Sequence, residues 1–248
     1  PQTRSSQSWG HGDLADLAEL ARWADGHGAS VLAHNPLGAT IPVPHQQPSP
    51  YYASSRRFLS PLYLRVGSLP GSELLGDELA RAATAGQALN DDSYVDRDAV
   101  WALVSRAVRD LWTQVRGTDH TRALLVAART DAALVDHARF CALAERHGGG
   151  WSLFPPECRH PASAGTATAA GELADEVDRW IWTQVMTRAQ LDAASRSGAS
   201  LMADLPVGFN PDGSDAWIDQ DLLAHGCRIG APPDDLGPLG QDWGLPPY

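Results

Sequence analysis

Two stretches of the chain carry apolar residues at helical spacing, and both lead into the same short motif. After the first stretch residues 28–34 read GASVLAH, and after the second residues 198–204 read GASLMAD. Each Gly stands where a helix can end in a left-handed residue, and the apolar run after it is typical of a strand. Helix, Gly and strand make half of a βα unit, so the repeat predicts a parallel sheet or barrel. The apolar positions of the two helices are Leu14, Leu17, Ala18, Ala21 and Ala24 after a capping Asp13, and Leu173, Val177, Trp180, Ile181 and Val185.

A proline-rich stretch follows the first predicted strand. Proline stands at positions 42, 44, 48 and 50, which excludes a helix or a central strand. We therefore expect a long surface loop at the carboxyl end of the strand, where α/β folds place their chemistry. The second predicted strand is likewise followed by loops, and these are rich in Asp, Trp and amide side chains.

Residues 72 to about 147 have mostly helical patterning, which predicts a helical insertion between two barrel strands. Two apolar stripes carry this prediction, one of Val100, Val104, Val108, Leu111, Trp112 and Val115, the other of Leu134, Val135, Ala138, Cys141, Ala142 and Glu145. Most tryptophans on helices are expected in the core. Trp182 falls off its stripe and is the one expected to reach a surface.

The patterning divides the chain into three regions. Residues 1–71 hold the first barrel βα units and the proline-rich loop, residues 72–161 the helical insertion, and residues 162–248 a barrel helix, a strand and further loops. Residues 162–170 are nearly all Ala, Ser, Thr and Gly, and we expect them to form a mobile loop. The fold class predicted is α/β with a mainly helical inserted subdomain.

Composition excludes several kinds of partner. The 248 residues are 43% hydrophobic and carry a net charge of -11, which disfavours nucleic acid and anionic membranes. The three cysteines are widely spaced and form no CxxC pair. No apolar run approaches the roughly 18 residues of a membrane span. We expect a soluble protein of a reducing, cytoplasmic compartment.

The loops after the predicted strands suggest a surface for sugars. A sugar ring has an apolar face, which suits aromatic platforms, and a rim of hydroxyls, which suits carboxylates and amides. The plainer interpretation is that Trp belongs to the core and that a loop Asp forms a turn. His34, at the end of the first strand, is positioned for substrate contact, but a packed or solvated imidazole is the favoured interpretation. The residues that fit a sugar surface are Tyr51, Asp212, Asp234, Gln241 and Trp243.

Metal and cofactor sites have weaker support. Four oxygen-bearing side chains between positions 210 and 221 have the spacing of a calcium loop, but Asp215 stands where that loop needs Gly. Cys158 and His160 supply only two ligands, which more often form an ordinary loop. Motifs for nucleotide binding, serine hydrolysis and zinc proteolysis are absent from the sequence. We expect no metal and no cofactor.

Several strings, in order along the chain, resemble the 4-alpha-glucanotransferases, or amylomaltases, of glycoside hydrolase family 77. The strings are SWGHGDL at 8–14, NPL at 35–37, PSPY at 48–51, SRRF at 55–58, PLY at 61–63, FPPE at 154–157, DLPV at 204–207, DGSDAW at 212–217, and GAPPD at 230–234 with GQDWG at 240–244. The resemblance is weakest in the helical insertion. Any one string is unspecific, but nine in register are specific.

The resemblance implies a (β/α)8 TIM barrel, of which this chain would hold a part, and transfer of α-1,4-glucan segments by a retaining double displacement. It also implies that the nucleophilic Asp, the acid/base Glu and a stabilising Asp follow residue 248, so this chain holds no catalytic carboxylate and is expected to be inactive alone. Tyr51 and Asp212 then correspond to substrate contacts, and Asp234, Gln241 and Trp243 to contacts on the acceptor side. The expected partners are maltooligosaccharides or α-1,4-glucans.

Departures from the family pattern and two other interpretations remain. Asp235 and Leu236 stand where the family loop often carries aromatic residues. A non-catalytic carbohydrate-binding module would use the same loop residues but would fold as a closed unit. The third interpretation is that the sequence is incomplete and that no natural protein has this length.

Overall fold

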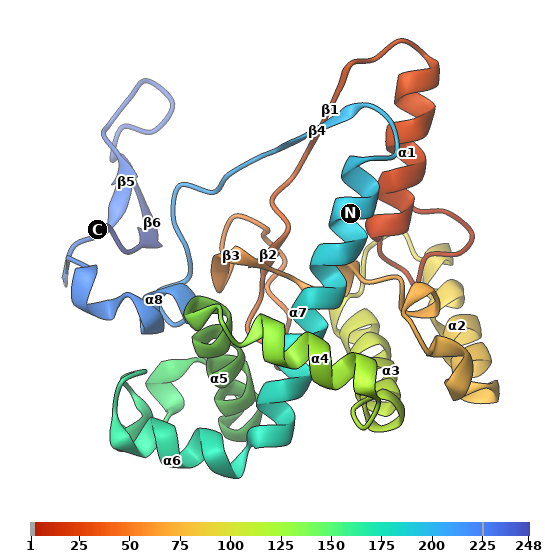
Figure 1. Ribbon diagram of the computed structural model, residues 1–248. Coiled ribbons are helices and arrows are strands. Elements are labelled where there is room, and N and C mark those ends of the chain that lie inside the picture. The colour runs from red at the N-terminus through yellow and green to blue at the C-terminus, as the bar shows by residue number, and fades with distance from the viewer. Residues whose placement is uncertain (1–2, 225) are drawn as a thin grey trace.

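The computed structural model describes residues 3–224 and 226–248, and it mixes helices with three short strand pairs (Figure 1). The helices are α1 (Leu14–Gly26), α2 (Asp77–Ala88), α3 (Arg97–Val115), α4 (Asp119–Ala128), α5 (Ala132–His147), α6 (Ala164–Glu172), α7 (Ala174–Ser195) and α8 (Ser214–Ile218). The strands are β1 (Val31–His34), β2 (Gly38–Ala39), β3 (Ser55–Leu59), β4 (Ser200–Ala203), β5 (Ile229–Ala231) and β6 (Gln241–Leu245).

The two copies of the repeated motif form adjacent parallel strands. Val31 pairs with Ser200, and the register continues to His34 beside Ala203. Each strand follows its own helix, α1 before β1 and α7 before β4, and the two helices pack against each other. The predicted parallel pairing is therefore confirmed. No closed barrel is present in the part of the chain that the structure describes.

The two glycines of the repeat have different roles. Gly28 has φ +83°, as predicted for a residue that ends a helix on the left-handed side. For Gly198 the prediction was wrong, because its φ is not positive. A Cβ at Gly198 would overlap the backbone carbonyl of Ala21, and the neighbouring Ala199 N–H donates to that carbonyl at 3.1 Å. Gly198 is thus required by the close approach of the chain to α1.

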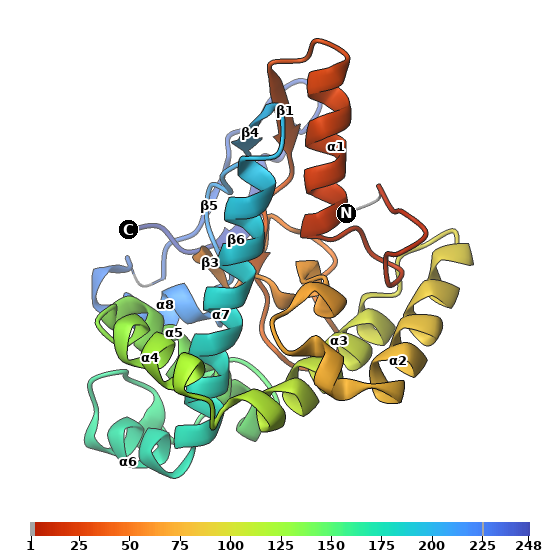
Figure 2. The same ribbon diagram turned by 45° about the vertical axis from the view of Figure 1, so that its right-hand side comes forward.

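Helix α7 runs through the centre of the molecule, and α1, α4 and α5 pack around it (Figures 1 and 2). Because neighbours surround its middle, buried residues occur on every side, and Trp182 is only 3% exposed. The expectation that Trp182 reaches the surface was therefore wrong. Its ring lies against that of Trp112, and Trp180 stacks on Trp101. Both predicted stripes of the insertion face this core.

Residues 162–170 were expected to form a mobile loop, and this expectation was wrong. Residues 164–170 lie in α6, and the Ser163 side chain caps this helix by accepting a hydrogen bond from the N–H of Thr166. Thr166 is buried, and a Cβ at Gly165 would overlap the carbonyl of Glu157. Small residues are used here because the helix lies close to another segment, not because the segment is loose.

Candidate functional site

Tyr51 is held at the carboxyl end of β4 by a hydrogen bond between distant parts of the chain. Its phenol donates to Asp204 Oδ2 at 2.6 Å, and the Asp204 N–H donates to the carbonyl of His34 at 3.0 Å. The bond to the carboxylate raises the pKa of Tyr51, because it stabilises the protonated phenol. Tyr51 remains 46% exposed, so part of its ring is available for contact.

His34 lies at the end of β1, beside a pocket of about 640 Å³ between α1 and the strand pair. Its Nδ1 is 2.8 Å from the carbonyl of Asn35. Leucines of α1 and β1 line one part of the pocket, while His34 and Asp204 line another. The pocket therefore joins an apolar wall to polar groups at the strand ends.

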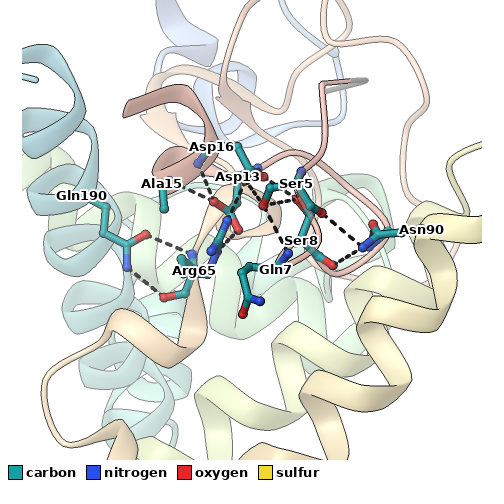
Figure 3. Close-up of polar contacts among 10 residues, drawn as sticks. Ser5, Gln7, Ser8, Asp13, Ala15, Asp16, Arg65, Asn90 and Gln190 are labelled. Carbon is teal, nitrogen blue, oxygen red and sulfur yellow. Dashed lines mark hydrogen bonds and ion pairs between the residues drawn. The ribbon is translucent and has the colours of Figure 1, made fainter. Parts of the chain in front are cut away.

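The start of α1 is fixed by a polar network beside this pocket (Figure 3). Arg65 donates to Asp13 and, at 2.7 Å, to Asp16. The hydroxyls of Ser5 and Ser8 donate to Asp16, each at 2.6 Å. Burial raises the pKa of Asp13, and the bond from Arg65 opposes that shift. Because each of these carboxylates already accepts at least three bonds within the protein, we assign them a structural role.

Asp212 lies in the loop before α8, half-buried, with both carboxylate oxygens bonded to one residue. Ser152 donates its N–H to Oδ1 at 2.7 Å and its hydroxyl to Oδ2 at 2.8 Å. The following helix is anchored by Asp215, which is buried and accepts from Ser55 at 2.6 Å and from the Arg56 N–H at 2.8 Å. The position of Asp212 is therefore defined by its bonds to Ser152 and by the anchored helix that follows it.

The hairpin of β5 and β6 carries the remaining three predicted site residues. Trp243 Nε1 donates to Gln241 Oε1 at 2.9 Å, so the indole and the amide lie together on one face of β6. Asp234 sits in the loop between the strands, where it accepts from the N–H groups of Leu236 and Gly237. Asp234 thus forms a turn in this structure, and all three side chains reach solvent.

Arg56 connects these loops. Its guanidinium donates to the carbonyls of Pro206 and Val207, each at 3.1 Å, and lies 5.2 Å from the ring centre of Phe209. It also donates to the Tyr248 hydroxyl at 3.3 Å. The chain after β4 and the segment after β6 are therefore held to β3 by one side chain.

Of the five predicted site residues, the structure joins two by a hydrogen bond and does not gather all five into one cluster. Gln241 meets Trp243, whereas Tyr51 and Asp212 each bond a residue that was not singled out, Asp204 and Ser152. Across residues 3–224 and 226–248 no hydrogen bond joins Tyr51, Asp212 and the hairpin. Asp204 could have been found from its place directly after a strand. Nothing in the sequence indicates that Ser152 meets Asp212.

The described segments contain neither a cluster of metal ligands nor a membrane-spanning helix. No group of three or more His, Cys, Asp or Glu side chains in them is placed to hold a metal ion. Cys158 is buried, and His160 instead lies 3.2 Å from Asp221. Of the helices described, none has the length and apolar character needed to cross a bilayer.

Comparison with known proteins identifies close sequence relatives. A 4-alpha-glucanotransferase of Mycobacterium tuberculosis is 44% identical over 266 residues, which cover 99% of this chain and 36% of that protein. A 4-alpha-glucanotransferase of Haemophilus influenzae is 32% identical and is covered to 39%. The chain therefore spans somewhat over a third of the length of these relatives.

Solved structures agree with the sequence comparison. The amylomaltase of Corynebacterium glutamicum superposes with a TM-score of 0.81 at 31% identity, over 100% of this chain and 35% of that one. An amylomaltase of Streptococcus agalactiae, solved in complex with acarbose, superposes with a TM-score of 0.77 at 18% identity, over 97% of this chain and 50% of that one. The model of glycoside hydrolase family 77, described as 4-alpha-glucanotransferase, matches residues 3–248. The chain belongs to this family.

Proposed function

We propose that this chain supplies glucan-binding loops of a 4-alpha-glucanotransferase, which moves an α-1,4-glucan segment to the 4-hydroxyl of glucose or of another glucan. The observation that carries the proposal is the family match across residues 3–248. The loops at the carboxyl ends of β1 and β4 and the hairpin offer the carboxylate, amide and aromatic groups that suit a sugar.

The proposed architecture is part of a (β/α)8 barrel. Helix α1 with β1 and helix α7 with β4 are two neighbouring units of that barrel, and residues 72–161 form an inserted helical subdomain. The superposition on an amylomaltase over the full chain supports this assignment. All three cysteines are free, which suits a reducing cytoplasm.

In the proposed mechanism these loops bind and orient sugar, while bond cleavage uses other residues. A retaining transfer needs a carboxylate nucleophile and an acid/base carboxyl about 5 to 5.5 Å apart. We place both in the part of the relatives' length that this chain does not cover. Asp212 accepts hydrogen bonds from the hydroxyls of the sugar at the cleaved bond. The exposed faces of Tyr51 and Trp243 pack on sugar rings. On the acceptor side, Gln241 and Asp234 form hydrogen bonds with sugar hydroxyls.

The test is the Asp212→Ala variant of the complete product of the reading frame that contains these residues. We expect kcat/KM for glucose release from maltotriose to fall by about two orders of magnitude, because a preorganised carboxylate at the reacting sugar is lost. The unfolding free energy should fall by only about 1 to 2 kcal/mol, because two exposed bonds to Ser152 are lost.

Two results contradict this proposal. Equal loss of stability and turnover would make Asp212 a structural residue. Maltoheptaose binding without any turnover by the complete product would identify a carbohydrate-binding module instead of a transferase.

A further inference from the structure

Asp212 is bonded by a turn that lies some sixty residues earlier in the chain, between α5 and α6. In that turn Ser152 donates to both carboxylate oxygens, one through its N–H and one through its hydroxyl. A carboxylate bonded at both oxygens cannot rotate about the Cβ–Cγ bond without losing a bond. The plane of the carboxylate is therefore set by Ser152.

The same turn fixes the backbone beneath the carboxylate. The Trp151 N–H donates to the carbonyl of Asp212 at 3.3 Å, and the indole Nε1 donates to the carbonyl of Pro211 at 2.9 Å. A Cβ at Gly150 would overlap both the carboxylate and the carbonyl of Asp212. Gly is needed at position 150 because the two segments lie in direct contact.

The turn that contains Ser152 is itself anchored to the core. Phe154 is buried and packs on Phe140 and Trp217, with ring centroids 5.6 and 6.2 Å away. Arg159 donates to the carbonyls of Phe154 at 2.9 Å and of Ser152 at 3.2 Å. Displacing Ser152 would break these contacts, so the turn acts as a rigid support.

Each carboxylate oxygen accepts one bond from Ser152 and keeps a further lone pair. Sugar hydroxyls can therefore donate to Asp212 without displacing Ser152. We propose that Ser152 is a positioning residue, which orients the Asp212 carboxylate for hydroxyls of an α-1,4-glucan. This inference rests on the proposed function, in which Asp212 contacts the glucan. Ser152 acts through Asp212 and does not touch the sugar.

The experiment compares Ser152→Ala, Ser152→Thr and Asp212→Ala in the complete product of the reading frame, with maltotriose as substrate. Ser152→Ala loses the hydroxyl donor but keeps the N–H, and Ser152→Thr keeps both. Ser195→Ala is the matched control, because Ser195 is exposed at the end of α7 and its hydroxyl donates to the carbonyl of Asp192.

We expect Ser152→Ala to lower kcat/KM about tenfold, because a misoriented carboxylate holds the sugar in a less reactive position and so costs rate more than stability. Its melting temperature should stay within about 2 °C of the parent, since the side chain is exposed. Ser152→Thr and Ser195→Ala should keep kcat/KM within about twofold. The double variant Ser152→Ala/Asp212→Ala should be no slower than Asp212→Ala alone. Ser152 acts only through the Asp212 carboxylate, so its loss has no further effect once that carboxylate is gone.

The outcomes separate this inference from the proposed function. If Asp212→Ala is impaired but Ser152→Ala matches Ser195→Ala, the inference is wrong and the proposed function stands. Additive effects in the double variant, or a loss in Ser152→Thr as large as in Ser152→Ala, also overturn the inference alone. A parent protein that neither releases glucose from maltotriose nor binds maltoheptaose overturns both.

Discussion

His137 forms the centre of a fully buried Ser–His–Cys arrangement next to the Asp212 loop. Its Nδ1 lies 2.8 Å from Ser214 Oγ, its Nε2 lies 3.5 Å from Cys141 Sγ, and the ring of Phe58 stacks on it. Such a set resembles a nucleophilic triad, but Ser214 and His137 have no exposed surface. Burial lowers the pKa of His137 to about 3, so the imidazole is neutral and its role is to join α5 to α8.

The buried imidazole predicts a loss of stability in acid. An unfolded chain takes up a proton at this residue below its ordinary pKa of 6.5, whereas the folded chain does so only near 3. Stability is therefore complete above pH 6.5 and falls as the pH decreases toward 3, by about 2 kcal/mol from this residue at pH 5. The measurement is the unfolding free energy in urea from pH 7 to pH 5, for the parent and for His137→Gln. An unchanged slope in the variant would contradict the assignment.

The bond between Tyr51 and Asp204 predicts a second effect at the residue scale. Tyr51→Phe keeps the ring but removes the donor, so the ring loses its fixed position above the end of β4. We expect kcat/KM for maltotriose to fall about threefold to tenfold in the complete product, with a stability change below about 1 kcal/mol. Tyr94→Phe is the control, since Tyr94 is 89% exposed. Equal kinetics of the two variants would show that the bond has no part in substrate binding.

At the scale of elements, the close approach of the segment after α7 to α1 requires Gly at position 198. Gly198→Ala places a Cβ against the carbonyl of Ala21 and disturbs the bond from Ala199, so we expect a loss of about 2 kcal/mol or more. Gly26→Ala, in the last turn of α1, has nothing within 4 Å of the new Cβ and should be neutral or stabilising by up to about 1 kcal/mol. Urea unfolding of both variants measures the difference. A Gly198→Ala variant as stable as the parent would mean that α1 can shift to make room for the Cβ, and that Gly is not required at position 198.

Helices and strands with strong patterning were predictable from the sequence, and the helix α6 was not. The predicted stripes of α1, α3, α5 and α7 are buried or partly buried, because one apolar face was enough to define each of these helices. In α6 the small residues reflect close packing against the segment at Glu157, which involves no local periodicity. Trp182 was misplaced for a related reason. A stripe identifies one buried face, but only the packing of neighbouring helices shows that a second face is buried too.

For the candidate site, the sequence predicted the residue types but not their partners. Tyr51 and Asp212 lie on loops near the strand ends, where the pattern of helix and strand suggested chemistry. Their partners, Asp204 and Ser152, are 153 and 60 residues away along the chain, so no local pattern connects them. Asp234 was proposed for sugar contact, and the structure also gives it the turn-forming bonds of the plainer interpretation.

At the scale of the whole molecule, the parallel pair β1–β4 is poorly covered, because neither strand contains a fully buried residue. Among the residues described, each of these strands pairs only with the other. Val31 is 53% exposed and Met202 is 57% exposed. Parallel sheets are normally covered on both faces, and unpaired strand edges are templates for further pairing. The 248-residue chain alone should therefore associate with itself at micromolar concentration.

Sedimentation velocity tests this expectation with charged variants. Lysine on an exposed strand opposes pairing between edges, so the double variant Val31→Lys/Met202→Lys should sediment mainly as a monomer. Val126→Lys is the control, because Val126 is exposed on α4, away from the strands, and the same charge should leave association unchanged. If the parent chain is already monomeric at these concentrations, its strand pair does not act as an open edge. Such a result would favour a closed carbohydrate-binding module over part of a barrel.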